Sequence, residues 1–286
     1  MIFPSFQATL TPGQAADAVV AEIKSAGGKA IASYDSVEDG ERIIETAIQN
    51  FGRIDVLINN AGIVRDKPFG ETTDDDYEAI VRTHIRGAYK CARAAWPHFR
   101  KQKYGRVINT SSPAGLFGCD DRCVYSAAKS ALIGFTETLA KEGFKYNILA
   151  NAISPLASSR MIVHLNTREA LDLLGPEKVV PLVAVLVHSS NKQETGGTFE
   201  VGGGQMAKIR WERAKGALLK TDESMTPGAL LKKWDQVSDF SESEHATGPA
   251  DFVTLLEEAS KMGSNDRGEE VSLKGRVAVI TGAGGG

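Results

Sequence analysis

The sequence has 286 residues, a formal net charge of −3 and 42% hydrophobic residues, with cysteines only at Cys91, Cys119 and Cys123. These values suit one soluble domain of ordinary size with an appendage, and they argue against a protein that binds nucleic acid or an acidic membrane surface. The odd number of cysteines argues against a disulfide framework and favours a reducing compartment. No apolar run reaches the ~18 residues of a membrane span. The first residues lack the basic region and apolar core of a secretory signal.

Helical and strand patterns alternate along the chain. Apolar residues recur at helical spacing in the longer segments, and the short apolar runs between them are typical of buried strands. In chain order, we expect a helix over residues 14–25, a strand over 30–34, a helix over 37–51, a strand over 54–58, a helix over 73–102, a strand over 105–110, a helix over 123–145, a strand over 148–153, a helix over 176–188 and a strand over 197–201. Strands that alternate with helices of this length pair in parallel through right-handed crossovers. The sequence therefore predicts an α/β fold with a doubly wound parallel sheet.

Candidate functional residues follow several of the predicted strands. Ligands of doubly wound sheets bind at the carboxyl ends of the strands. We therefore expect the residues at these ends to lie along one rim of the sheet. They are Asp35, Asn59, Ser112 and Pro155.

Tyr125 and Lys129 lie four residues apart on a predicted helix, which places both side chains on one face. A free phenol has a pKa near ~10 and is a poor base at neutral pH. An ammonium one turn away favours the phenolate and lowers that pKa. With Ser112 available to hydrogen-bond the same substrate oxygen, the pair predicts a proton-transfer device. Taken alone, the pair also fits a packed tyrosine and a solvated lysine.

The character of the chain changes after Gln205. Residues 208–215 are rich in lysine and arginine, which we interpret as a solvated surface rather than a phosphate site. Helical patterns near residues 227–234 and 249–262 flank an acidic, polar stretch, so residues 207–265 predict a helical connector. Cys119 and Cys123 have no second pair and no nearby histidine, so we expect no metal site.

The motifs Asn59-Asn60-Ala61-Gly62, Ser112 and Tyr125-x-x-x-Lys129 together resemble the short-chain dehydrogenase/reductase family, in which they occur in this order after strands of a parallel sheet. Longer phrases, such as FGRIDVLINNAGIVRDK and YSAAKSALIGFTETLAKEG, resemble one branch, the fungal peroxisomal multifunctional β-oxidation enzymes. That branch carries two tandem dehydrogenase domains and a hydratase domain. The resemblance implies a Rossmann-like dehydrogenase domain over residues 1–206 without its usual N-terminal strands, a helical connector over 207–265, and the first strand and truncated glycine loop of a second dehydrogenase domain over 266–286.

The resemblance also implies an activity, the oxidation of a (3R)-3-hydroxyacyl-CoA to a 3-ketoacyl-CoA with NAD. Ser112 would hold the substrate oxygen and Tyr125 would exchange its proton. Lys129 would bind the nicotinamide ribose and depress the pKa of the tyrosine. His84 stands where most relatives carry the asparagine of a water relay, and a packed, passive histidine is the alternative. The remaining implied cofactor contacts are Asp35 at the adenine, Asn59, Ala61 and Gly62 along the adenosine ribose, and Pro155 and Leu156 beside the nicotinamide.

The implied partners are an acyl-CoA substrate and a second dehydrogenase domain, either in a homodimer or in tandem, with neither nucleic acid nor membrane. The branch is peroxisomal, whereas this chain ends in Gly-Gly-Gly rather than a Ser-Lys-Leu-type signal. Two alternatives stay open: a non-catalytic remnant that acts as a folding or dimerisation module, and a dehydrogenase for another secondary alcohol. The residues leave both NAD and NADP open.

Two further features are the acidic loop before Tyr125 and an apolar run near the end of the sequence. Asp120 and Asp121 lie in an unusual loop before Tyr125, and they would oppose phenolate formation if they point inward. Residues 276–280 form an apolar run of strand type, followed by glycines that resemble a dinucleotide loop. We expect this run to dock parallel to residues 54–58 as an added strand.

Overall fold

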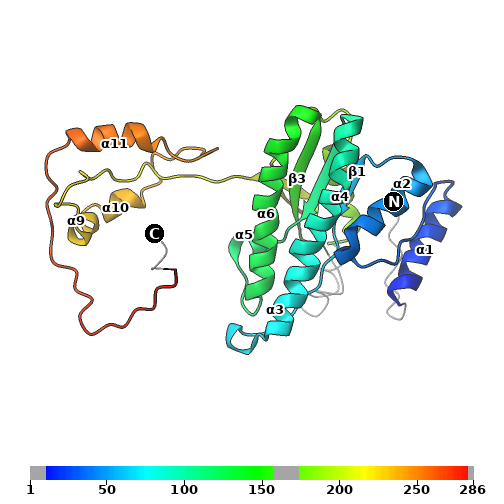
Figure 1. Cartoon of the computed structure of the whole chain (residues 1–286), viewed down its shortest axis with the longest axis horizontal. Helices are drawn as coiled ribbons and strands as arrows, with labels where there is room; N and C mark the ends of the chain where they lie inside the picture. Colours follow the sequence, from blue (N-terminus) through cyan, green and yellow to red (C-terminus); the bar gives the residue numbers. More distant parts are fainter. Residues whose placement is uncertain (1–10, 158–173, 283–286) are drawn as a thin grey trace. The chain divides into compact units, whose positions relative to one another are not determined.

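The structure is a computed structural model that describes residues 11–157 and 174–282. The chain divides into two compact units, Met1–Ile209 and Arg210–Gly286 (Figure 1). The first unit contains all the named strands and most of the helices. Its elements in chain order are α1 (Pro12–Ser25), η1 (Val37–Asp39), α2 (Gly40–Phe51), β1 (Val56–Asn59), η2 (Phe69–Glu71), α3 (Asp74–Val81), η3 (Arg82–Arg86), α4 (Gly87–Gln102), β2 (Gly105–Thr110), α5 (Pro113–Phe117), α6 (Cys123–Gly143), η4 (Phe144–Tyr146), β3 (Ile148–Pro155), η6 (Pro176–Val179), α8 (Val180–Val187), β4 (Thr198–Gly202) and β5 (Gln205–Ile209).

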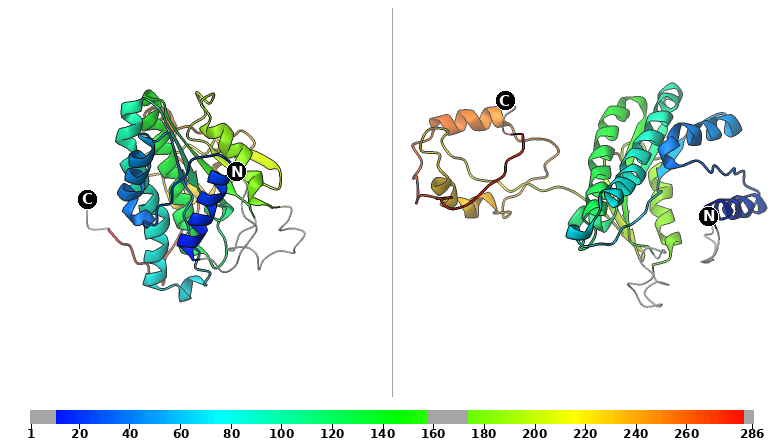
Figure 2. Two further views of the ribbon diagram at one scale, coloured as in Figure 1. Left: turned by 90° about the vertical axis from the view of Figure 1, so that its right-hand side faces the viewer. Right: turned by 60° about the horizontal axis from the view of Figure 1, so that its bottom comes forward.

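The strands form a five-stranded sheet in the order β1-β2-β3-β4-β5, in which β1 to β4 are parallel and β5 is antiparallel to β4. Successive residues of a strand face opposite sides of the sheet. Val107 accordingly packs in the core cluster with Phe99 of α4, whereas Ile108 packs with Leu182 and Leu186 of α8. Figure 2 shows α4 and α8 on opposite sides of the strands. This arrangement confirms the predicted doubly wound α/β fold.

The helix expected over residues 73–102 begins and ends as the sequence indicates, but it is interrupted. Thr73 and Asp76 form a capping box at its start, and Lys103 ends it in the left-handed conformation with φ 53°. Between α3 and α4, the five residues of η3 form a π-helical segment. Such segments are rare and are frequently found at functional sites. His84 lies within it.

Two strand expectations differ from the structure. Residues 30–34 form no strand, and Ile31 and Tyr34 are exposed. Conversely, β5 was not expected: it follows β4 through Gly203 and Gly204, whose φ values of 56° and 90° suit the tight turn of a two-residue hairpin. Its side chains are mostly exposed, so it lacks the apolar pattern that marks a buried strand.

The second unit contains three short helices, α9 (Pro227–Leu231), α10 (Trp234–Val237) and α11 (Phe252–Lys261), among its described residues. The expected strand over residues 276–280 does not form, and Val277 and Val279 are 96% and 90% exposed. The expectation that this run docks beside residues 54–58 is wrong, because β1 pairs only with β2 in the described sheet. Of the glycine loop that would follow, residues 283–286 lie outside the described part of the chain.

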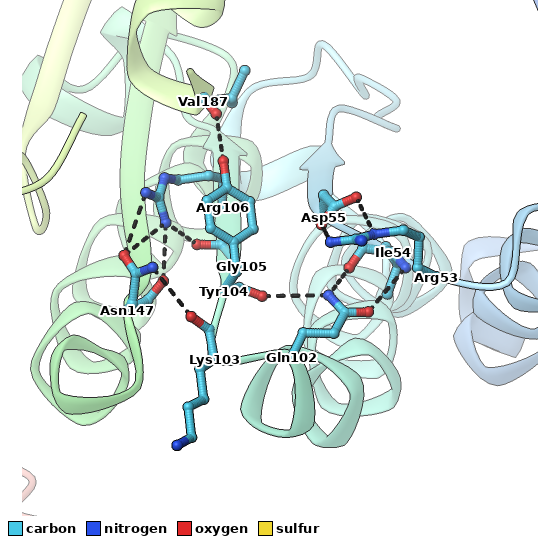
Figure 3. A network of polar contacts seen from close by, with 10 residues as sticks. All are labelled: Arg53, Ile54, Asp55, Gln102, Lys103, Tyr104, Gly105, Arg106, Asn147 and Val187. Carbon is cyan, nitrogen blue, oxygen red and sulfur yellow. Dashed lines mark hydrogen bonds and ion pairs between the residues drawn. The ribbon is translucent and has the colours of Figure 1, made fainter. Parts of the chain in front are cut away.

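The amino ends of β1, β2 and β3 are joined by a polar network (Figure 3). Arg106 is buried, lies 4.3 Å from the centroid of the Tyr104 ring, and donates to the backbone oxygen of Asn147 over 2.9 Å. Gln102 Nε2 donates to the backbone oxygen of Ile54 over 2.6 Å. These hydrogen bonds hold the amino ends of the three strands in register, and they thereby help to position the carboxyl ends. A groove of about 740 Å³ at this amino edge is lined by Trp96, Pro97, Arg100, Lys101, Lys103, Lys145, Tyr146 and Asn147.

Candidate active site

The carboxyl ends of β1 to β3 carry three of the four expected rim residues. Asn59 is the last residue of β1, Ser112 follows β2 and Pro155 is the last residue of β3. Asp35 follows no strand. It accepts a hydrogen bond from Ser33 over 2.9 Å, and it pairs with Arg42 across 3.7 Å.

Ser112, Tyr125 and Lys129 come together where β2 ends against α6. Tyr125 and Lys129 are 8% and 3% exposed. Lys129 Nζ donates to the backbone oxygen of Thr110 over 2.6 Å and lies 5.6 Å from the centroid of the Tyr125 ring. Ser112 caps α5 by accepting a hydrogen bond from the backbone nitrogen of Ala114, and its side chain is close enough to Tyr125 to lower the pKa of that phenol. A serine, a phenol and an ammonium therefore converge at the rim.

Close packing at α5 holds α6 in this place. Ser111 Oγ donates to the backbone oxygen of Lys129 over 2.8 Å. A Cβ atom on Gly115 would lie 2.7 Å from Lys129, which is too close for any side chain without a shift. Glycine at this position lets the turn after β2 touch the helix that carries the tyrosine and the lysine.

Burial dominates the electrostatics of the pair. Burial raises the pKa of Tyr125, while the hydroxyl of Ser112 and the charge of Arg122 act in the opposite direction. Burial also lowers the pKa of Lys129 to about 8. The expected lowering of the Tyr125 pKa by Lys129 is therefore not found, because both groups lie in a desolvated region that favours their neutral forms.

His84 belongs to the same cluster. Its ring meets the Tyr125 ring edge-on, with centroids 5.4 Å apart. Nε2 lies 2.8 Å from the backbone oxygen of Ile63 and 3.1 Å from its nitrogen, whereas buried Nδ1 has no partner among the described residues. Burial, helped by the charge of Lys129, lowers the pKa of His84 to about 4, so the ring is neutral at pH 7. Gly62 permits this contact, since a Cβ there would lie 2.6 Å from His84 Cε1.

The other expected cofactor contacts differ in how free they are. Asn59 Nδ2 donates to Asn109 Oδ1 over 2.8 Å, so this side chain is engaged in joining β1 to β2. Asn60 Oδ1 accepts a hydrogen bond from Thr110 Oγ1 over 3.2 Å. Ala61 and Leu156 are exposed at the rim. Ala61 and Leu156 therefore offer open surface for a ligand, whereas Asn59 has a structural partner.

The unusual loop before Tyr125 does not turn its own acids inward, since Asp120 and Asp121 are exposed. Instead, Arg122 forms a two-pronged ion pair with Asp66, with Nε–Oδ1 and Nη2–Oδ2 distances of 2.8 and 2.9 Å. Asp66, and not a loop aspartate, is the acid that raises the pKa of Tyr125. The sequence reasoning missed this pair, and the only available signal was an arginine three residues before the tyrosine.

Metal-ligand groups and membrane-spanning helices were sought within residues 11–157 and 174–282. Within these ranges, no three or more histidine, cysteine, aspartate or glutamate residues are grouped so that they could hold a metal ion. No described helix has both the length and the apolar character needed to cross a bilayer.

Comparisons with known proteins identify the family of the chain. Residues 8–168 match the short chain dehydrogenase family. The chain is 62% identical over 282 residues to the peroxisomal hydratase-dehydrogenase-epimerase of Neurospora crassa, covering 99% of this chain and 32% of that relative. The chain spans about a third of the length of curated relatives it matches, such as this protein and its namesake in Saccharomyces cerevisiae.

Solved structures show the same likeness. Full-length peroxisomal multifunctional enzyme type 2 of Drosophila melanogaster superposes with a TM-score of 0.75 at 36% identity, covering 86% of this chain and 43% of that one. A short chain dehydrogenase of Mycobacterium avium superposes with a TM-score of 0.69 at 36% identity, covering 79% and 80% of the two chains. The chain belongs to the short-chain dehydrogenase/reductase family of oxidoreductases.

Proposed function

We propose that this chain carries a (3R)-3-hydroxyacyl-CoA dehydrogenase activity that uses NAD and Tyr125 as its proton-exchanging group. The observation that carries the proposal is the convergence of Tyr125 with Ser112 and Lys129 at the carboxyl end of β2. Membership of an oxidoreductase family supports the reaction class. The acyl-CoA substrate is what the resemblance of the sequence implies, and the names of the relatives, a peroxisomal hydratase-dehydrogenase-epimerase and a peroxisomal multifunctional enzyme, agree with it.

The rim residues fit a nicotinamide dinucleotide. An ammonium carries three N–H donors, and Lys129 Nζ has one acceptor in the described part of the chain, the backbone oxygen of Thr110. Its remaining donors suit ribose hydroxyls. When bound, the nicotinamide ring takes up or returns the hydride of the substrate carbon. The other residues that would contact the cofactor are Asp35, Asn59, Ala61, Gly62, Pro155 and Leu156. Asn59 would do so through its backbone, because its side chain donates a hydrogen bond to Asn109.

Ser112 and Tyr125 share the work on the substrate oxygen. Ser112 would hold that oxygen, and Tyr125 would donate a proton to it during reduction or accept one during oxidation. Burial favours the neutral phenol, which is the form that donates. The ring of neutral His84 lies beside the tyrosine ring, and its buried Nδ1 has no partner among the described residues. We therefore assign it the relay of protons, through a water, between the cluster and solvent.

The test is the reduction of a 3-ketoacyl-CoA followed by NADH absorbance. Loss of a general acid costs roughly 10²–10⁴-fold in rate, so Tyr125→Phe should reduce the rate by about that factor. Tyr89→Phe is the matched control, because Tyr89 is exposed on α4 and bonds Arg93 rather than a rim residue. Equal rates for wild type and Tyr125→Phe would defeat the proposal, and profiling of acyl-chain length would test the substrate class.

The same proposal extends to location and assembly. Relatives named as peroxisomal favour a peroxisomal site of action, and their larger size favours pairing with a second dehydrogenase domain. Co-localisation of a tagged chain with a peroxisomal marker tests the first point. Sedimentation of the purified chain tests the second, since a strictly monomeric species contradicts a homodimer.

A further inference from the structure

The loop before α6 is tied to the loop after β1 by two contacts. Arg122 and Asp66 form their two-pronged ion pair with side chains 15% and 35% exposed. Beside it, the backbone nitrogen of Lys67 donates to the backbone oxygen of Asp121 over 2.8 Å. Two parallel N–H···O bonds restrict orientation as well as distance. The pair therefore acts as a clamp between two loops that flank the rim.

This clamp lies directly beside the tyrosine. Arg122 is the residue before α6, and its side chain makes no capping bond with that helix. Asp121 adopts φ 60°, a left-handed conformation that aspartate adopts more readily than most residues, and its backbone oxygen accepts the bond from Lys67 in this conformation. The same loop after β1 carries Ile63, which bonds His84. The clamp thus connects both neighbours of Tyr125, the start of α6 and the histidine.

We propose, on the basis of the proposed function, that Arg122 and Asp66 are positioning residues that fix the start of α6 and thereby orient the Tyr125 phenol for proton exchange. A surface ion pair of no consequence is the competing explanation, and exposed pairs are typically worth less than about 1 kcal/mol. The two explanations differ in what happens at the tyrosine when the pair is broken from either side.

The charges around Tyr125 make that test sharp. Arg122 lowers the pKa of Tyr125, whereas Asp66 and Cys119 raise it. Lys129 lies on the same helix, Ser112 at the start of α5 and His84 in η3. Asp66→Asn leaves the arginine unbalanced, and Arg122→Gln leaves the carboxylate unbalanced. Both variants break the two-pronged ion pair, but they should move the tyrosine titration in opposite directions.

The experiment compares Asp66→Asn, Arg122→Gln and the conservative Arg122→Lys in two assays. The alkaline absorbance titration of Tyr125 is the difference between each protein and the same protein carrying Tyr125→Phe, which removes the signal of the other tyrosines. The second assay is kcat and KM against pH for 3-ketoacyl-CoA reduction. The matched control is Arg53 with Asp55, an exposed pair of the same geometry (2.9 and 2.7 Å) at the amino end of β1.

We expect Asp66→Asn to titrate Tyr125 at lower pH and Arg122→Gln at higher pH. Since small misplacement of a reacting group can cost about 10²-fold, we expect kcat to fall by about tenfold or more in both, with KM little changed. Arg122→Lys should recover part of kcat, and Arg53→Gln or Asp55→Asn should change nothing.

Shifts in one common direction, no shift, or an unchanged kcat in an active enzyme would overturn the inference. If the wild type has no reductase activity, the proposed function fails, and the titration alone then decides whether the clamp acts on Tyr125. In that case opposite shifts support the clamp, and their absence rejects it.

Discussion

Replacing Lys129 by methionine should separate the stability of the first unit from its proposed activity. Lys129 is 3% exposed, and burial lowers its pKa from 10.5 to about 8. At 1.36 kcal/mol per pKa unit, the charged form therefore carries a penalty of about 3 kcal/mol. Its hydrogen bond to Thr110 returns about 1.5–3 kcal/mol. The two effects nearly cancel, so Lys129→Met should change the free energy of unfolding at pH 7 by no more than about 1–2 kcal/mol while removing activity.

The pH dependence is the sharper measurement. The folded-state pKa of Lys129 lies below the unfolded value, so the unfolded chain binds more protons between pH 8 and 10.5. Stability of the wild type should therefore rise with pH in this window. Relative to Lys129→Met, we expect a gain of about 2 kcal/mol between pH 7.5 and 9.5.

Urea unfolding in a Trp211→Phe/Trp234→Phe background isolates the signal of Trp96, which lies in the first unit. Other lysines contribute equally to the wild type and to Lys129→Met, and they cancel in the difference. An identical pH dependence in the two proteins would refute the reasoning, because it would mean that the ammonium is solvated. A large loss of stability at pH 7 would show instead that the bond to Thr110 outweighs desolvation.

Three further substitutions test the site and the core. The pKa of His84 is about 4 in the folded chain and 6.5 in the unfolded chain. The free energy of unfolding of the wild type should therefore fall by up to about 3 kcal/mol as the pH falls through this window. His84→Gln should not show this loss when the two proteins are compared by urea unfolding at pH 7 and pH 4.5. Gly62→Ala places a Cβ 2.6 Å from His84 Cε1 and should lower the unfolding free energy by about 1–3 kcal/mol, against little change for the solvent-open Gly70→Ala. Phe99→Ala removes a fully buried side chain that packs against the sheet. It should lower the free energy of unfolding by about 3–5 kcal/mol, measured by the same urea unfolding.

The sequence is informative where a feature depends on spacing and topology. The four-residue separation of Tyr125 and Lys129 and the rule that ligands bind at the carboxyl ends of strands are enough to bring both residues beside Ser112. The doubly wound sheet follows from the alternation of helices and strands. The capping box at Thr73 likewise marks the start of α3.

Features that depend on distant partners cannot be predicted in this way. Residues 30–34 and 276–280 have strand composition, yet a strand also needs a neighbour to satisfy its backbone groups, and the described residues supply none. β5 is the opposite case, since β4 supplies a partner that its own exposed side chains do not announce. The pKa of Tyr125 depends on burial and on Asp66, neither of which is encoded in the spacing of the tyrosine and the lysine.

Burial therefore decides how the charges of the cluster are distributed. His84 and Tyr125 are neutral at pH 7. Lys129 has a pKa of about 8, so it loses its charge close to neutral pH. Under the proposed function, a neutral phenol is the form that donates a proton to a carbonyl, so the resting cluster is poised for reduction. Removal of an alcohol proton needs the phenolate, which burial opposes and which Ser112 and Arg122 support. The motif specifies which groups meet, and the balance between burial and these two neighbours sets the pKa of the phenol, and with it the fraction of Tyr125 that can act as a base.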